Sequence, residues 1–110
     1  MHVQGELVTG EAVADLGGLI LARRALHAMT AVADTSAQDR AVDRQYYLAF
    51  AHSWAGQMRP EQAQEMVTTD PHPPTEFRTN GTLANSREFQ TAFGIPAASP
   101  MVKSERCVIW

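Results

Sequence analysis

Cysteine is almost absent from the sequence: Cys107 is the only one in 110 residues, so no disulfide can form within the chain. Basic residues are also few and scattered, and the net charge of −3 argues against a nucleic-acid partner. No apolar run, Leu19–Ala22 included, is long enough to cross a bilayer, and the N-terminal residues show no signal-peptide pattern. These absences leave the expectation of a single domain over residues 1–110 with a modest core.

Apolar residues recur every three or four positions from residue 12 onward, as they do on one side of a long helix. The stripe consists of Ala12, Leu16, Leu19, Ala22, Leu26, Met29 and Ala33. Thr9 is expected to cap this helix, which places Glu11 in the first turn, where the helix dipole favours an anion. A polar stretch at residues 33–39 is expected to end the helix.

Three shorter helices are predicted in the rest of the chain. The second helix is expected over residues 42–58. Its buried face would consist of Tyr46, Phe50, Ala51, Trp54 and Met58. The third begins at Pro60, a residue that suits a first turn, and runs to about Thr68. The fourth follows Ser86 as its cap and stops at Gly94.

Between these helices the sequence predicts irregular structure. Residues 69–75, Thr-Asp-Pro-His-Pro-Pro-Thr, cannot form a regular element because their prolines remove backbone donors and fix φ. Residues 79–82, Thr-Asn-Gly-Thr, predict a turn, and the tail from Ile95 onward reads as irregular. The predicted fold class is therefore mainly α, with about four helices and an irregular proline-rich loop.

Two carboxylates in the first helix raise a question of charge. Glu11 and Asp15 are four residues apart, so a helix sets them side by side, where like charges destabilise it. The helix positions that would relieve the repulsion carry no basic residue. Either both side chains are solvated, or each has a partner outside the helix. Such partners would be a metal ion for Glu11 and the N–H of a metal-bound histidine for Asp15.

The proline-rich loop holds the other candidate residues. If residues 70–72 are extended, Asp70 and His72 point to the same side, and the aspartate would orient the imidazole. A rigid, oriented histidine suits transition-state stabilisation, because a preorganised donor costs no reorganisation during reaction. Arg78 lies six residues beyond, and its planar fork suits a carbonyl or carboxylate. The alternatives are a solvated histidine and a surface arginine or structural ion pair.

Taken together, four stretches resemble the C-terminal part of the neprilysin family of zinc metalloendopeptidases, which includes the endothelin-converting enzymes. These stretches are GEAVADLGGL, YYLAFAHSWAGQMRPE, TDPHPPTEFRTNGTLANSREFQTAFG and PMVKSERCVIW. They occur in the family's order and cover nearly the whole chain. The resemblance implies the helical C-terminal subdomain of a zincin-type metallopeptidase catalytic domain.

The resemblance also implies a role for each candidate residue. Glu11 stands at the family's third zinc ligand, and Asp15 at the aspartate that orients a zinc-bound histidine. His72 is similar to the histidine that stabilises the tetrahedral oxyanion, with Asp70 beside it. Arg78 looks like the arginine that holds the backbone carbonyl of the substrate.

Several parts of the family's machinery do not occur in the sequence. The first two zinc ligands and the general base of the family lie in a His-Glu-x-x-His helix, and no such motif is present. The Asn-Ala-Tyr/Phe segment that binds the substrate backbone and the large second domain are missing too. The family's asparagine after the glutamate is Ala12 here, and the cysteine after the second-helix tryptophan is Ala55. We therefore expect a C-terminal fragment of a peptidase catalytic domain, with the disulfide partner of Cys107 outside it.

These departures set the functional expectation. A catalytic zinc needs about three protein ligands, so the chain alone is expected to be inactive and not to retain Zn²⁺, whereas the complete enzyme would cleave peptides. The first helix would lack its neighbour, and we expect a homodimer or association with the missing N-terminal half. The alternative is a non-catalytic helical module for self-association or partner binding. Intact members of the family are membrane-anchored or exported, and nothing in this sequence assigns a compartment.

Overall fold

The structure, a computed structural model, describes residues 2–30 and 37–109. These residues form five helices and no strand. The helices are α1 (Gly5–Thr30), α2 (Ala37–Ser53), α3 (Pro60–Thr69), α4 (Thr75–Ala84) and α5 (Arg87–Phe93). The mainly α fold class is therefore confirmed, with one helix more than the sequence predicted. Within the described ranges, none of the helices has the length and apolar character needed to span a membrane.

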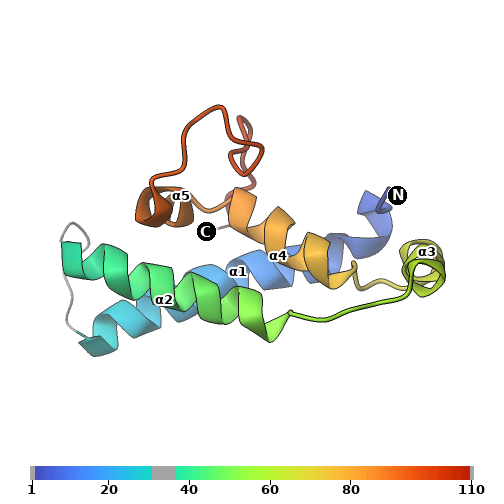
Figure 1. Cartoon of the computed structure of the whole chain (residues 1–110), viewed down its shortest axis with the longest axis horizontal. Coiled ribbons are helices and arrows are strands. Elements are labelled where there is room, and N and C mark those ends of the chain that lie inside the picture. Colours follow the sequence, from blue (N-terminus) through green and yellow to red (C-terminus); the bar gives the residue numbers. More distant parts are fainter. Residues whose placement is uncertain (1, 31–36, 110) are drawn as a thin grey trace.

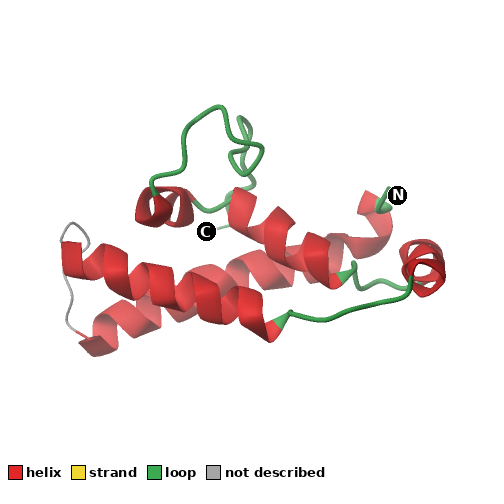
Figure 2. Ribbon diagram, viewed as in Figure 1, coloured by secondary structure: helices red, strands yellow, loops and turns green. Residues whose placement is uncertain are grey.

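The two longest helices set the shape of the molecule. Figures 1 and 2 show α1 and α2 running side by side in opposite directions along the longest dimension. The shorter α4 packs on α1, and α5 packs on α2 (Figure 1). Because α4 lies on the N-terminal half of α1, residues more than 60 positions apart in the sequence meet there.

The core lies where α1, α2, α4 and α5 meet. Its most buried members, each no more than 4% exposed, are Leu19, Tyr47, Leu83 and Ala92. Partly buried side chains that pack around them are Tyr46, Phe50, Phe89 and Met101. The hydroxyl of Tyr47 lies 3.1 Å from Oγ of Ser86, and burial raises the pKa of Tyr47 well above its ordinary value. The phenol is therefore held neutral inside the core, with its polar end satisfied.

The start of α1 differs from the prediction. The helix begins at Gly5, so Thr9 is not its cap; the hydroxyl of Thr9 instead donates to the carbonyl of Gly5 at 2.5 Å. Burial of Val8 explains the added turn, because it continues the apolar face toward the N-terminus. As a result Glu6, and not Glu11, is the acid in the first turn.

The apolar stripe predicted for α1 is only partly buried. Leu16 and Leu19 are 4% and 3% exposed, but Met29 is 84% exposed. Near the end of α1 the buried side chain is instead His27, which faces acidic residues of α2. A polar contact replaces the expected apolar one there. Ala33 and most of the stretch where the helix was expected to end lie outside the described residues.

The second helix begins and ends five residues earlier than predicted. It spans Ala37–Ser53 rather than 42–58, and Met58 lies beyond it, 39% exposed. The reason is that the first half of its buried face is acidic: Asp39 and Asp43 are 2% and 4% exposed. Apolar periodicity in the sequence cannot indicate an acidic buried face.

The turn predicted at residues 79–82 is wrong, because these residues lie inside α4. The helix starts after two prolines, and the N–H groups of Phe77 and Arg78 donate to the carbonyl of Pro74 at 2.8 and 3.1 Å. Burial of Leu83 at 4% exposure anchors the helix in the core. This tertiary contact outweighs the local preference of an Asn-Gly pair for a turn.

Two of the shorter helices match the prediction closely. α3 begins at Pro60 and ends one residue later than expected. The hydroxyl of Ser86 accepts the N–H of Phe89 at 3.1 Å and caps α5, which stops at Gly94. Gly94 has φ of +61°, in the left-handed region that glycine adopts at low cost. Residues 70–74 of the proline-rich loop and the tail up to residue 109 are irregular, as predicted, whereas Thr69 and Thr75 belong to α3 and α4.

Candidate active site

The candidate site lies where the N-terminal half of α1 meets the first turn of α4. Glu11 and Asp15 project from α1, one helical turn apart. Arg78 is the fourth residue of α4, and its backbone is held by the carbonyl of Pro74. The rigid prolines before α4 therefore determine where the arginine enters the site.

Arg78 is the partner that both carboxylates lack within their own helix. Its Nε and Nη2 atoms donate to Oδ2 and Oδ1 of Asp15 at 2.7 and 2.6 Å. Nη2 also donates to Oε2 of Glu11 at 3.1 Å. A planar guanidinium that meets a carboxylate at two points makes a strong, oriented pair. One cation thus offsets the repulsion between the two acids.

The two acids differ in how exposed their side chains are and in how many of their carboxylate oxygens are already hydrogen-bonded to Arg78. The side chains of Arg78 and Asp15 are 12% and 11% exposed, whereas that of Glu11 is 36% exposed. Hydrogen bonds to Asp15 raise the pKa of Arg78 above its ordinary value, although burial acts in the opposite direction. Asp15 is therefore engaged on both oxygens, while Glu11 retains Oε1 for a further partner.

His72 reaches the site from the loop between α3 and α4. Its backbone N–H donates to Oδ1 of Asp70 at 2.8 Å, and its ring Nδ1 lies 2.7 Å from the same oxygen. These contacts hold the pKa of Asp70 below its ordinary value, the backbone N–H contributing most. The Asp70–His72 contact predicted from sequence is confirmed. The other ring nitrogen, Nε2, lies 3.7 Å from Oε1 of Glu11.

The structure thus places all five predicted residues at one site. They are Glu11, Asp15, Asp70, His72 and Arg78. Carboxylate oxygens are among the atoms that bind zinc in proteins, so Glu11 fits the part of a zinc ligand. At this end of α1, however, the described residues contain no group of three metal-ligating side chains. These residues would therefore fit only one part of a zinc site.

A cavity of about 340 Å³ opens beside the arginine. Its lining includes Val8, Leu16, Phe77, Ile109, Asp15 and Arg78, from α1, α4 and the C-terminal tail. Apolar walls with a polar group at the edge are typical of pockets that bind small molecules and side chains. The cavity therefore suits an apolar side chain whose neighbouring polar atoms contact Arg78.

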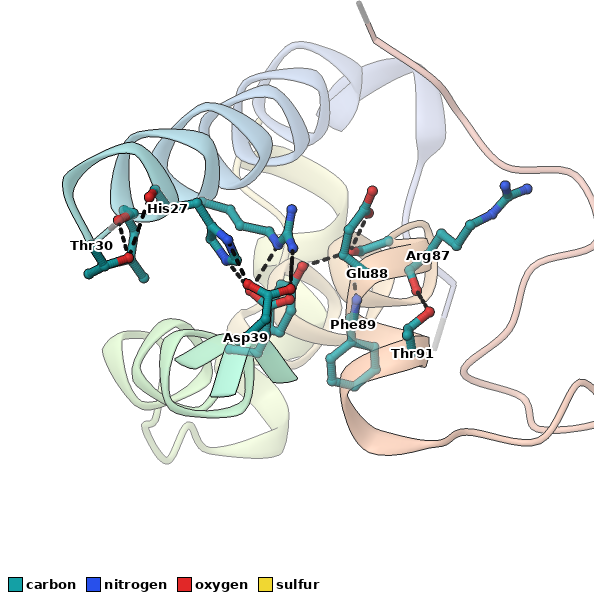
Figure 3. Close-up of polar contacts among 12 residues, drawn as sticks. His27, Thr30, Asp39, Arg87, Glu88, Phe89 and Thr91 are labelled. Carbon is teal, nitrogen blue, oxygen red and sulfur yellow. Dashed lines mark hydrogen bonds and ion pairs between the residues drawn. The ribbon is translucent and has the colours of Figure 1, made fainter. Parts of the chain in front are cut away.

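A second charged cluster joins α1 to α2, and the sequence prediction missed it. Figure 3 shows His27 of α1 pointing toward Asp39 of α2. The ring atoms Nδ1 and Nε2 of His27 lie 2.8 and 2.7 Å from oxygens of Asp39 and Asp43. Arg23 donates to both oxygens of Asp43 at 2.9 and 2.8 Å. The available signal was the spacing, because the two bases and the two acids are each four residues apart.

The cluster is arranged as a set of ion pairs rather than as an open metal site. Ligand atoms of His27, Asp39 and Asp43 lie within 4.8 Å of one another, close enough to hold a metal. Both ring nitrogens of His27 already face carboxylate oxygens, however, and Arg23 engages both oxygens of Asp43. Burial by itself would lower the pKa of Arg23, but its bonds to Asp43 outweigh burial and raise it. The cluster therefore fastens α1 to α2.

Comparison with known proteins places the chain in a family. The profile of peptidase family M13 matches residues 1–109. Human endothelin-converting enzyme 1 is 36% identical over 98% of this chain and 14% of its own length. Neprilysin-1 of Caenorhabditis elegans is 33% identical over 100% of the chain and 15% of its own length. Endothelin-converting enzyme 1 of Cavia porcellus is 37% identical, again over 98% of the chain and 15% of its own length.

The chain therefore spans about one-seventh of the length of these relatives. No solved structure matches it significantly. The match to the family profile covers residues 1–109, and this range contains all but the last residue of the four stretches singled out in the sequence. M13 peptidases are zinc metallopeptidases, which agrees with the carboxylate, histidine and arginine that meet beside α1. The chain belongs to peptidase family M13.

Proposed function

We propose that this chain supplies one side of the active site of a zinc metalloendopeptidase. Glu11 would be the third zinc ligand, His72 the donor to the oxyanion and Arg78 the group that holds a backbone carbonyl of the peptide. Zinc bound there would acidify a water molecule and polarise the scissile carbonyl. The chain's own residues then bind the substrate and stabilise the charge that develops on it.

One observation carries this proposal: α4 and the proline-rich loop bring their two basic side chains to the acids of α1. Arg78 lies 3.1 Å from Glu11, and His72 lies 3.7 Å from the other oxygen of the same carboxylate. Nothing local in the sequence requires this meeting across more than 60 residues. A shared site for metal and substrate accounts for it, because both basic groups then face the position where negative charge forms.

Each residue has a distinct task in this proposal. The ring of His72 is fixed by Asp70, so its Nε2 donor needs no reorientation when an oxyanion forms nearby. The fork of Arg78 is fixed by Asp15, which holds the guanidinium beside the cavity. By resemblance to the family, Asp15 would also orient a zinc-bound histidine. The aspartate would then contact both the arginine and that histidine.

Because a catalytic zinc needs about three protein ligands and the described residues offer no group of three at this position, the isolated chain is predicted not to cleave peptides. Purified chain incubated with a mixture of peptides and added Zn²⁺ should give no products by mass spectrometry. Turnover that stops on addition of a chelator would show this prediction to be wrong.

The roles of the residues are testable in a chimera. This chain would replace the matching segment of endothelin-converting enzyme 1, and the chimera should cleave peptides and contain zinc. Glu11→Gln should lose the bound zinc, as measured by metal analysis, because an amide is a poor zinc ligand. Glu6→Gln, on an exposed residue of the same helix, is the matched control. Retention of zinc and activity by the Glu11 variant would rule out the ligand role.

The second candidate function is a non-catalytic helical module that associates with itself or with a partner. Large apolar side chains exposed on α1 and α2 favour it: Leu21 is 52% exposed, Leu48 58% and Met29 84%. Apolar surface of this kind is often covered by association. Light scattering coupled to size exclusion should then report twice the chain mass of 12.1 kDa, and Leu48→Glu should reduce it. A monomer at all concentrations would exclude self-association.

A further inference from the structure

Trp54 stands next to the candidate site, although none of the site's predicted residues required it. It directly follows the last residue of α2, and its backbone N–H donates to the carbonyl of Ala51 at 3.2 Å. This turn directs the indole toward α4. The guanidinium carbon of Arg78 lies 4.0 Å from the centre of the indole ring. Tryptophan offers a cation the most favourable aromatic face, so the contact is attractive as well as close.

The indole is not held in place by a hydrogen bond of its own. Its Nε1 atom is buried and has no hydrogen-bond partner among the described residues. The contact with Arg78 is therefore the polar interaction that the structure gives this side chain. A tryptophan that served only as core packing would gain more from a place where its N–H is satisfied.

Only some of the N–H donors of Arg78 are bonded to the two carboxylates. Nε and Nη2, along one edge of the guanidinium, bind Asp15, and Nη2 also binds Glu11. Nη1 has no acceptor among the residues that the structure describes. An arginine has five N–H donors in one plane, so the two on Nη1 remain for another molecule.

We propose that Trp54 is a positioning residue for Arg78, which rests on the proposed role of Arg78 in binding peptide. The bonds to Asp15, and the longer bond from Nη2 to Glu11, all meet the guanidinium along one edge, which leaves the opposite edge able to tilt. The indole face blocks that tilt from one side. Together the two contacts fix the plane of the guanidinium, and the free Nη1 donors then take a constant direction toward a backbone carbonyl of the substrate.

The alternative is that Trp54 merely fills space and that Asp15 and Glu11 orient the arginine without it. The two accounts differ in what removal of the ring does to Arg78. Cation–π contacts amount to about 0.5–2 kcal/mol, which corresponds to roughly a two- to thirtyfold change in the population of the held conformation. A space-filling tryptophan would affect the stability of the chain without a specific change at Arg78.

Nuclear magnetic resonance of the whole chain, without zinc or peptide, separates the two accounts. In the wild-type chain the side-chain protons of Arg78 should be shifted upfield by the ring beneath them. Trp54→Leu should abolish this shift and raise the exchange rate of the Arg78 Nε proton by roughly two- to thirtyfold. Trp54→Phe should restore part of both effects. Phe93→Leu removes an aromatic ring from α5 and is the matched control that should leave Arg78 unchanged.

Unchanged Arg78 signals in a folded Trp54→Leu chain would overturn the proposal. If that variant does not fold, Arg78→Gln gives the reciprocal test, because it should shift the ring signals of Trp54 and Arg78→Lys should shift them less. Trp54 ring signals that are the same in wild type, Arg78→Gln and Arg78→Lys would also overturn the proposal. Since neither metal nor peptide is present, this result is independent of whether Glu11 binds zinc.

Discussion

At the scale of single residues, Arg78 is the side chain on which the site depends most. It pairs with Asp15 at two points, touches Glu11 and lies over the ring of Trp54. Its side chain is 12% exposed, so these contacts are largely shielded from water. The sequence alone identified Arg78, but not these partners, because contacts between residues more than 60 positions apart depend on how α4 packs on α1.

Replacing the arginine should destabilise the chain. Arg78→Gln would leave Asp15 and Glu11 unpaired and adjacent on α1, and lost hydrogen bonds to charged groups cost about 1.5–3 kcal/mol each in related cases. We expect the free energy of unfolding in urea to fall by roughly 1–3 kcal/mol. Glu76→Gln changes an exposed charge on the same helix and should have little effect. Equal stability of wild type and the Arg78 variant would contradict the pairing.

The contact of His72 with Asp70 predicts a specific acid titration. The pKa of Asp70 lies below its ordinary value because the folded chain donates hydrogen bonds to the carboxylate. Its stabilising contribution is therefore complete above the ordinary pKa and is lost as the pH falls through the lowered one. The titration of the Asp70 carboxyl can be followed by its carbon chemical shift. His72→Ala should move its midpoint part of the way back toward the ordinary pKa of an aspartate, since the backbone N–H of residue 72 still donates to it. A midpoint that stays in place would show that the ring contributes nothing.

At the scale of helices, the boundaries set by local sequence signals were predicted correctly, and those set by tertiary contacts were not. The start of α3 at Pro60 and both ends of α5 follow from residues that act locally, a proline and a serine cap with a glycine stop. The limits of α2 do not follow from local residues, because buried ion pairs with α1 determine them. The existence of α4 does not either, because it depends on the burial of Leu83. Apolar periodicity cannot show an acidic buried face, and an Asn-Gly pair reads as a turn wherever packing does not override it.

The cap of α5 provides a test at this scale. Ser86 accepts the N–H of Phe89, and its hydroxyl also lies 3.1 Å from that of Tyr47 in the core. Ser86→Ala should lower the free energy of unfolding by about 1 kcal/mol through loss of the cap, and by more if the phenol is left unpaired. Ser104→Ala, in the exposed tail, serves as the control for chemical denaturation. No difference between the two variants would mean that the cap does not stabilise the helix.

At the scale of the whole molecule, two long helices carry the site at one end and the ion cluster at the other. The cluster of Arg23 and His27 with Asp39 and Asp43 fastens α1 to α2, while α4 brings Arg78 to the opposite end of α1. The family and all five residues of the candidate site were predicted from motifs in the sequence. The ion cluster did not, because no single stretch contains it and it has no counterpart among the motifs.

The most direct test of the central claim is a zinc titration of the labelled chain, followed by chemical shift. The account predicts weak binding, with the earliest shifts at Glu11 and His72, and their loss in Glu11→Gln but not in Glu6→Gln. Shifts confined to His27, Asp39 and Asp43, or shifts that persist unchanged in Glu11→Gln, would contradict it. The acids of α1 would then be a structural feature of the fold without a part in binding zinc.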